Sequence, residues 1–253
     1  MQTSQFKNKT ILITGAGSGM GRQTALQLAS EGAQLALIGR QLEPLATLSN
    51  ELKKMGVDSL AITCDISIEE SVILTIEKIK THFGKLDGVF ANAGILGDFK
   101  TLAETEKDDF ITLFNTNLLG TFFTIKHSLS LMAQGSIVIN ASWTANAVMP
   151  GAGAYASTKG AILAMMKTLA IEQGPNNIRV NAINPGIILT PMAEEVLDQA
   201  LSTRLAQQAA LKRNGTPEDV AGTVAWLLSD NSPFVTGQEI TIDGGYSIGG
   251  VRL

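Results

Sequence analysis

Short apolar runs rich in β-branched residues recur along this chain, and longer segments with a helical hydrophobic period separate them. Strands that alternate with helices form parallel sheets, and runs that are apolar throughout indicate helices on both faces of the sheet. An open doubly wound sheet and an eightfold barrel both show this alternation of strands and helices. The seven apolar runs favour the open sheet. The predicted strands are 10–14, 34–38, 59–63, 87–91, 136–140, 179–183 and 239–242.

The loop after the first predicted strand is rich in glycine. Residues 14–21 read TGAGSGMG and lead directly into an amphipathic helical segment. Glycines let a backbone turn tightly and approach a pyrophosphate, and a helix N-terminus supplies free N–H groups to the same anion. The spacing is not the common Gly-x-Gly-x-x-Gly, because Met20 stands at the position of its third glycine. Together with the alternation of strands and helices, this loop predicts a dinucleotide site.

Composition excludes several other classes of function. The chain has 253 residues, 45% of them hydrophobic, and no linker or repeat, so we expect a single domain over 1–253. A net charge of −4 without a Lys/Arg cluster argues against nucleic acid. No signal peptide or run of eighteen apolar residues is present, which predicts a cytoplasmic protein without a membrane anchor. One cysteine, Cys64, and two distant histidines indicate neither a disulfide nor a metal site.

A tyrosine and a lysine stand four residues apart in the segment AYASTKGA, as Tyr155 and Lys159. In a helix, side chains at positions i and i+4 lie on the same face, so the phenol and the ammonium would be neighbours. Such a pair is suited to proton transfer, and it is equally compatible with simple packing. The motifs in the rest of the chain favour the chemical interpretation.

Further short motifs follow one another along the chain. In order they are Thr14-Gly15-x3-Gly19-x-Gly21, Asn92-Ala93-Gly94, Asn117, Ser142, Tyr155-x3-Lys159, Pro185-Gly186 and Thr190. Together these motifs resemble those of the single-domain short-chain dehydrogenases/reductases. The resemblance covers essentially the whole chain and ends in TGQEITIDGGYS at 236–247. It implies a Rossmann-type α/β fold with about seven parallel strands, a bound nicotinamide dinucleotide, and hydride transfer to or from a carbonyl or alcohol carbon.

The resemblance assigns catalytic roles to four residues. Tyr155 is the implied general acid/base, and a nearby ammonium on Lys159 is expected to lower the pKa of its phenol. Lys159 also holds the ribose, Ser142 hydrogen-bonds the substrate oxygen, and Asn117 positions a relay water. Ser142 ends a predicted strand, at the sheet edge where open α/β folds bind ligands, although a hydroxyl there could simply cap the next turn.

The implied cofactor site draws on several strand ends. Asp65 resembles the acid that contacts the adenine, Asn92 the asparagine that steadies the central sheet, and Thr190 the residue at the carboxamide. The full expected set is Gly15, Ser18, Gly19, Met20, Gly21, Arg40, Asp65, Ile66, Asn92, Ala93, Gly94, Tyr155, Lys159, Pro185, Gly186, Ile188 and Thr190.

The end of the second predicted strand indicates which nicotinamide is bound. NAD sites commonly place an acid there for the ribose hydroxyls, whereas a 2′-phosphate needs room and an arginine. Gly39 stands at the acidic position and Arg40 follows it. We therefore predict NADP(H). The alternative is that Arg40 is merely a solvated side chain at the start of the next helix.

The substrate is expected to be small and moderately hydrophobic, a ketone or secondary alcohol. Its pocket is predicted from apolar residues that could equally close a core, namely Leu96, Trp143, Met149, Ile187, Ile188, Leu189 and Met192.

Other functions remain open at this stage. They are an acyl-carrier-protein 3-oxoacyl thioester reductase, a non-catalytic redox sensor and an extended epimerase or dehydratase. By resemblance, segments 117–132 and 152–170 and the C-terminal tail are expected to form a homotetramer.

Overall fold

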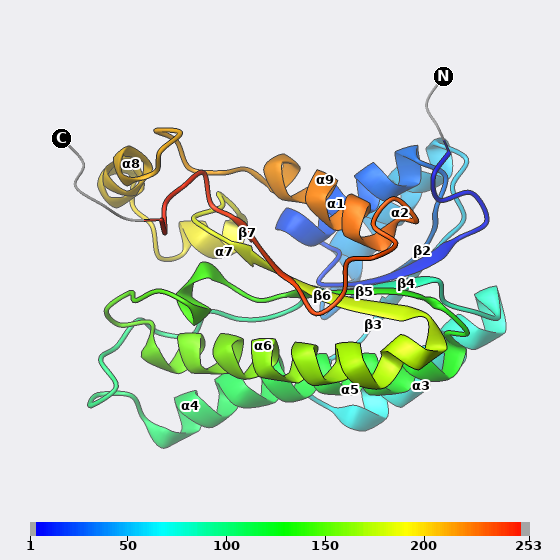
Figure 1. The fold of residues 1–253 in the computed structure, drawn as a ribbon, viewed down its shortest axis with the longest axis horizontal. Helices are drawn as coiled ribbons and strands as arrows, with labels where there is room; N and C mark the ends of the chain where they lie inside the picture. Colours follow the sequence, from blue (N-terminus) through cyan, green and yellow to red (C-terminus); the bar gives the residue numbers. More distant parts are fainter. Residues whose placement is uncertain (1–3, 249–253) are drawn as a thin grey trace.

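A computed structural model of the chain describes residues 4–248. Within that range, seven strands form one parallel sheet in the order β3-β2-β1-β4-β5-β6-β7 (Figure 1). Every predicted strand is present, so the predicted doubly wound Rossmann-type fold is confirmed. The largest difference is at β6, which continues through Pro185. The strands are β1 (Thr10–Thr14), β2 (Gln34–Gly39), β3 (Ser59–Thr63), β4 (Gly88–Ala91), β5 (Gly135–Asn140), β6 (Ile178–Pro185) and β7 (Glu239–Ile242).

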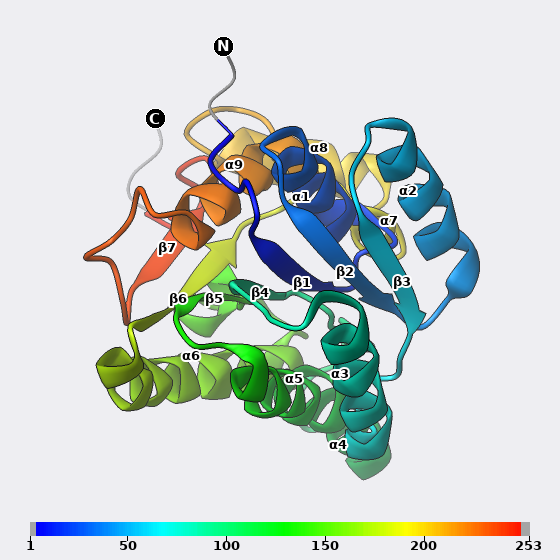
Figure 2. The ribbon, with the colours of Figure 1, turned by 90° about the vertical axis from the view of Figure 1, so that its right-hand side faces the viewer.

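Helices cover both faces of the sheet. Figures 1 and 2 show α1, α2 and α9 on one face and α3, α5 and α6 on the other. In residues 4–248, no helix is long and apolar enough to cross a membrane. The α-helices are α1 (Gly19–Ser30), α2 (Leu42–Lys54), α3 (Glu69–Phe83), α4 (Lys107–Leu113), α5 (Gly120–Ser128), α6 (Gly153–Gln173), α7 (Pro191–Glu194), α8 (Gln199–Gln208) and α9 (Pro217–Leu228).

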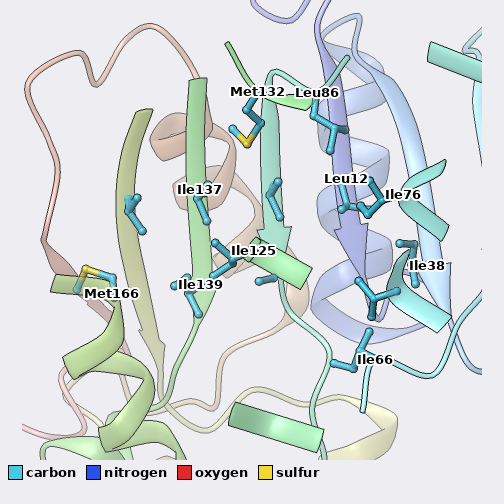
Figure 3. Close-up of a cluster of buried hydrophobic side chains, with 14 of the residues drawn as sticks. Leu12, Ile38, Ile66, Ile76, Leu86, Ile125, Met132, Ile137, Ile139 and Met166 are labelled. Carbon is cyan, nitrogen blue, oxygen red and sulfur yellow. The ribbon is translucent and has the colours of Figure 1, made fainter. Parts of the chain in front are cut away.

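Each face of the sheet has its own apolar core. Leu12 of β1 points into the core beneath α3, α5 and α6, whereas its neighbours Ile11 and Ile13 point into the core beneath α1, α2 and α9. Successive strand residues face opposite sides, so a strand that is buried on both faces must be apolar throughout. Figure 3 shows the first of these cores, with Ile137 and Ile139 of β5 among its members.

The topology places a switch point at β1, in the middle of the strand order. β1 pairs with β2 on one side and with β4 on the other, so the strand order reverses at β1. Ligands of open α/β sheets bind at this switch point, outside the carboxyl ends of the strands. The glycine-rich loop follows β1, and Asn92 follows β4, so both stand at that edge.

Candidate active site

The glycine-rich loop adopts a backbone that only glycine accommodates well. Gly15 and Gly19 have φ angles of 67° and 50°, in the left-handed region. A Cβ atom at Gly21 would clash with the carbonyl oxygen of Gly15, so the first turn of α1 packs directly on the loop. Met20, between them, packs against the core beneath α1. The predicted glycines are therefore required by the turn itself.

The start of α1 is suited to an anion. No acidic residue stands in its first turn, so the positive end of the helix dipole is not offset there. Ser18 is the N-cap residue, is exposed, and makes no side-chain cap hydrogen bond. Free N–H groups, the dipole and an unused hydroxyl fit the phosphates of a dinucleotide. This cradle is where the loop would hold a nicotinamide cofactor.

A hydrogen-bonded cluster ties the three central strands together beside this cradle. The side-chain amide of Asn92 donates to the carbonyl oxygen of Thr14 (2.9 Å), and the N–H groups of Asn92 and Ala93 both donate to the Thr14 hydroxyl (3.0 Å each). Asn140, at the end of β5, donates to Oδ1 of Asn92 (3.0 Å). Thr14 belongs to the glycine-loop motif, but neither Thr14 nor Asn140 was among the expected site residues, because the sequence does not show which strand-end side chains hydrogen-bond across the sheet.

Tyr155 and Lys159 lie on one face of α6, next to Ser142. Nζ of Lys159 is 5.5 Å from the centroid of the Tyr155 ring and donates to the carbonyl oxygen of Asn140 (2.7 Å). The hydroxyls of Tyr155 and Ser142 are hydrogen-bonded. Lys159 is buried and meets no carboxylate within residues 4–248. The structure therefore brings three of the four expected catalytic side chains into one cluster.

The pKa of Tyr155 beside Lys159 differs from the expectation. Burial raises the pKa of Tyr155 to about 12, and the hydrogen bond with Ser142 opposes that shift only in part. Burial also lowers the pKa of Lys159 to about 8. The expectation that Lys159 lowers the phenol pKa is wrong for this geometry, because its ammonium is directed at the Asn140 carbonyl and the ring face. At neutral pH the phenol keeps its proton, the form that donates to a carbonyl oxygen.

Asn117, the fourth expected residue, is fully buried in a π-helical turn, Phe114–Leu119. Its amide exchanges two hydrogen bonds with the backbone of Ile95 (2.8 and 2.9 Å) and donates to the Thr158 hydroxyl (3.2 Å). Thr158 in turn donates to the carbonyl oxygen of Tyr155 (2.7 Å). In these contacts Asn117 links the loop after β4 to the catalytic helix. Thr158 was missed because a hydroxyl inside a helical period carries no distinguishing pattern.

Ser142 has two roles. It follows β5 and is the N-cap of a short 3₁₀ turn, Trp143–Ala145, where its Oγ accepts from the N–H (3.2 Å) and hydroxyl (2.9 Å) of Thr144. The capping role and the bond to Tyr155 therefore coexist. The cap fixes the rotamer of Ser142 and so holds its hydroxyl beside the phenol.

The remaining expected cofactor residues follow the ends of β2, β3 and β6. Arg40 is exposed and has no ion-pair partner among the described residues. Asp65 accepts from the N–H and hydroxyl of Ser67 (2.9 and 2.7 Å), and Ile66 after it is buried. Thr190 caps α7 and stands against the loop, since a Cβ on Gly19 would lie 3.1 Å from its methyl group. Because the strands are parallel, all these positions share one edge of the sheet.

A cavity of about 560 Å³ opens beside Trp143. Trp143 and Met149 line it as expected, and Tyr246 meets the Trp143 ring edge-on at 4.9 Å between centroids. The rest of its lining comes from residues that the sequence did not indicate, namely Phe99, Val148, Pro150, Val196, Leu197, Leu201, Arg204, Leu205 and Gln208.

Five expected pocket residues do not line this cavity. Leu189 and Met192 are about two-fifths exposed, which places them at the surface. Ile188 is buried, forms an isolated bridge with Gly215, and lines a separate cavity of about 150 Å³. Leu96 and Ile187 line neither cavity. In this segment Ile188 therefore packs in the core beneath α9, whereas Leu189 and Met192 lie at the surface.

Comparison with known proteins assigns the family. A family model described as enoyl-(acyl carrier protein) reductase matches residues 15–247. A 3β-hydroxysteroid dehydrogenase of Mediterraneibacter gnavus is 32% identical, over 96% of each chain. A 3-oxoacyl-(acyl-carrier-protein) reductase of Staphylococcus aureus is 37% identical, over 94% of this chain and 97% of the relative. The chain belongs to the short-chain dehydrogenase/reductase family. It is therefore an oxidoreductase of the short-chain type.

Solved structures of short-chain enzymes superpose closely. Levodione reductase matches with a TM-score of 0.94 and 33% identity, over 97% of this chain and 100% of that one. An NAD⁺-bound xylitol dehydrogenase matches with a TM-score of 0.91 and 35% identity, over 95% of this chain and 99% of that one. A Burkholderia cenocepacia short-chain dehydrogenase in complex with NADP matches with a TM-score of 0.91 and 27% identity, over 96% of this chain and 99% of that one. Similar short-chain structures thus hold either nicotinamide, and the choice must be argued from residues of this chain.

Proposed function

We propose that this protein is an NADP(H)-dependent oxidoreductase that transfers a hydride between the nicotinamide and a carbonyl or secondary alcohol of a small, hydrophobic substrate. The observation that carries the proposal is the cluster of Tyr155, Ser142 and Lys159 beside a largely apolar cavity. An active site needs a proton donor, a group that holds the carbonyl oxygen, and a space that excludes water. In this proposal Tyr155 is the donor, Ser142 holds the carbonyl oxygen, and the cavity lined by Trp143 is the space.

The glycine-rich loop at the start of α1 would hold NADPH, and the chemistry that the cofactor would supply there is a hydride for the carbonyl carbon. The phenol of Tyr155, protonated at neutral pH, donates its proton to the carbonyl oxygen. Ser142, fixed by its bonds to Thr144, donates to the same oxygen and orients it. Lys159, which donates to the Asn140 carbonyl beside the phenol, would hold the ribose of the nicotinamide. Asn117 holds α6 against the loop after β4 and, in this proposal, positions a water that returns the proton to Tyr155.

Three features support NADP(H) over NAD(H). β2 ends in Gly39, which leaves no acid to repel a 2′-phosphate. Arg40 is exposed and unpaired among the described residues, so its guanidinium is available to a phosphate. Ser18 is exposed at the start of α1 and makes no side-chain cap hydrogen bond, so its hydroxyl is available to the same phosphate.

A 3-oxoacyl thioester reductase is the second candidate. The 37% identity to a 3-oxoacyl-(acyl-carrier-protein) reductase favours it, and the same four catalytic residues would serve. A β-ketoacyl thioester therefore belongs in any substrate panel. A redox sensor without turnover is less well supported, because the catalytic side chains are clustered as an active enzyme needs them.

Replacing Trp143 with alanine is expected to change the choice of substrate. The indole lines the cavity and is only 7% exposed, so its removal enlarges that cavity. The ratio of kcat/KM for a bulky apolar ketone to that for a small one should rise roughly tenfold. This ratio does not depend on the folded fraction, and Trp143→Phe should shift it less. An unaltered ratio would remove Trp143 from the substrate site.

We also propose that the chain assembles as a homotetramer. Apolar side chains are exposed near α5, where Ile111, Leu119 and Phe122 are each about two-fifths accessible, and Ile171 of α6 is 80% accessible. Exposed apolar groups of this kind mark association surfaces. The end of the expected C-terminal face, 249–253, lies outside the described residues. Light scattering at micromolar concentration should give four times the chain mass of 26.7 kDa, and a monomeric mass would refute the assembly.

A further inference from the structure

Among the described residues that line the cavity beside Trp143, one side chain is charged, and it is basic. Nine of these residues are apolar, while the others are Tyr246, Gln208 and Arg204. Both Arg204 and Gln208 come from α8, four residues apart and so on one face. Leu201 and Leu205 of the same helix line the cavity as well. Figure 1 shows α8 at the same end of the molecule as the start of α6.

Arg204 has no partner within residues 4–248. In the described part of the chain, no carboxylate lies in ion-pair range of Arg204, no hydrogen bond involves it, and no acid lines the cavity. The nearby acid Asp198 is engaged as the N-cap of α8, where it accepts from the N–H of Leu201 (2.7 Å). A residue that both lines a cavity and is exposed stands at its mouth, and Arg204 does both. Its donors are therefore free to meet a group carried by a ligand.

The lining of the cavity thus combines two kinds of chemistry. Trp143, which lines it, directly follows Ser142 of the catalytic cluster in the chain. Most of the other lining side chains are apolar, and the exposed guanidinium of Arg204 and carboxamide of Gln208 stand at the mouth. A guanidinium binds carboxylates with paired, charge-assisted hydrogen bonds.

We propose that Arg204 is a specificity-determining residue that pairs with a carboxylate at the far end of the substrate. On this inference, which rests on the proposed function, the preferred substrates are apolar oxo acids or hydroxy acids. The reacting carbon lies at Tyr155 and Ser142, the hydrocarbon body lies against Trp143 and the leucines of α8, and the carboxylate lies at Arg204.

The test compares acids with their neutral esters. A homologous series of methyl ketones that end in a carboxylate, such as 9-oxodecanoate, and their methyl esters would be assayed with NADPH. We expect the intact protein to prefer the acid at one chain length or more, and Arg204→Ala to reduce the acid-to-ester ratio of kcat/KM about tenfold or more. Arg204→Lys should retain part of the preference. Lys78→Ala, which removes a positive charge from exposed α3, is the matched control and should leave the ratio unchanged.

A binding measurement keeps the test independent of turnover. Quenching of tryptophan fluorescence in the NADP⁺ complex would report the Kd of decanoate and of methyl decanoate. We expect Arg204→Ala to weaken decanoate alone, and salt to weaken decanoate in the intact protein. Turnover of neutral ketones, with Arg204→Ala changing neither the kcat/KM of the oxo acids nor the Kd of decanoate, would overturn this inference and leave the proposed function intact.

The inference would also be overturned if Arg204→Ala changed kcat/KM for coenzyme A thioesters alone. In that case Arg204 would bind a phosphate of the thioester carrier. Absence of all turnover would instead count against the proposed function.

Discussion

Replacing Tyr155 with phenylalanine is expected to reduce kcat about 10³-fold, because general acid catalysis contributes roughly 10²–10⁴-fold and this residue is the proton donor. The phenol is protonated at neutral pH, hydrogen-bonded with Ser142, and held on α6 one turn before Lys159. Phenylalanine keeps the ring and its contact with the ammonium. Binding of NADPH and the unfolding temperature should therefore change little. Steady-state assays, cofactor titration and thermal melts measure the three quantities separately.

The second tyrosine of the chain provides a comparison for this variant. Tyr246 lines the same cavity and touches Trp143 with its ring, so Tyr246→Phe alters substrate contacts without removing the proton donor. Its effect on kcat should stay below about tenfold. If Tyr155→Phe retained near-normal kcat, or Tyr246→Phe were the inactive variant, the assignment of the catalytic acid would be wrong.

Replacing Gly39 with aspartate is expected to change the cofactor preference from NADPH toward NADH. A carboxylate at the end of β2 accepts hydrogen bonds from the ribose hydroxyls of NAD(H) and repels a 2′-phosphate. The backbone tolerates the change, because Gly39 is not among the positive-φ glycines and an added Cβ would lie 3.5–3.7 Å from carbons of Leu45. The ratio of kcat/KM for NADPH to that for NADH should fall about 100-fold.

Two further variants separate charge from bulk in that experiment. Gly39→Ala adds the same Cβ without the charge and should leave the ratio nearly unaltered. Arg40→Ala removes the proposed phosphate partner and should weaken NADPH about tenfold with little effect on NADH. A ratio that did not respond to Gly39→Asp would show that the end of β2 does not select the cofactor.

Much of the fold could be predicted from the sequence because strand signals here are local. Each central strand is apolar on both faces and is bounded by turn residues. The order of the strands in the sheet then follows from the rules of doubly wound sheets. The predicted end of β6 at residue 183 was two residues too early, because the strand continues through Pro185. There Pro185 lies opposite Ile242 of β7, and as the last residue of the strand its missing N–H interrupts no further pairing.

The candidate site was predicted less completely, because its remaining parts depend on tertiary contacts. The cavity joins Trp143 to α8 and to Tyr246, which are far apart in the sequence. Hydrophobic period cannot tell which face of α8 meets a cavity, so Arg204 gave no signal. The expected effect of Lys159 on the pKa of Tyr155 was also wrong. The i, i+4 spacing places the two side chains together, but the direction of the ammonium depends on the Asn140 carbonyl.

The most direct test of the central claim is the fate of a deuterium label. NADPH carrying deuterium at the transferring carbon of its nicotinamide ring would be incubated with a panel of apolar ketones and a β-ketoacyl thioester, and the products analysed by mass spectrometry. We predict an alcohol with one deuterium on the former carbonyl carbon, formed in step with NADPH loss and almost absent with Tyr155→Phe. NADPH binding without label transfer to any member of the panel would contradict the account.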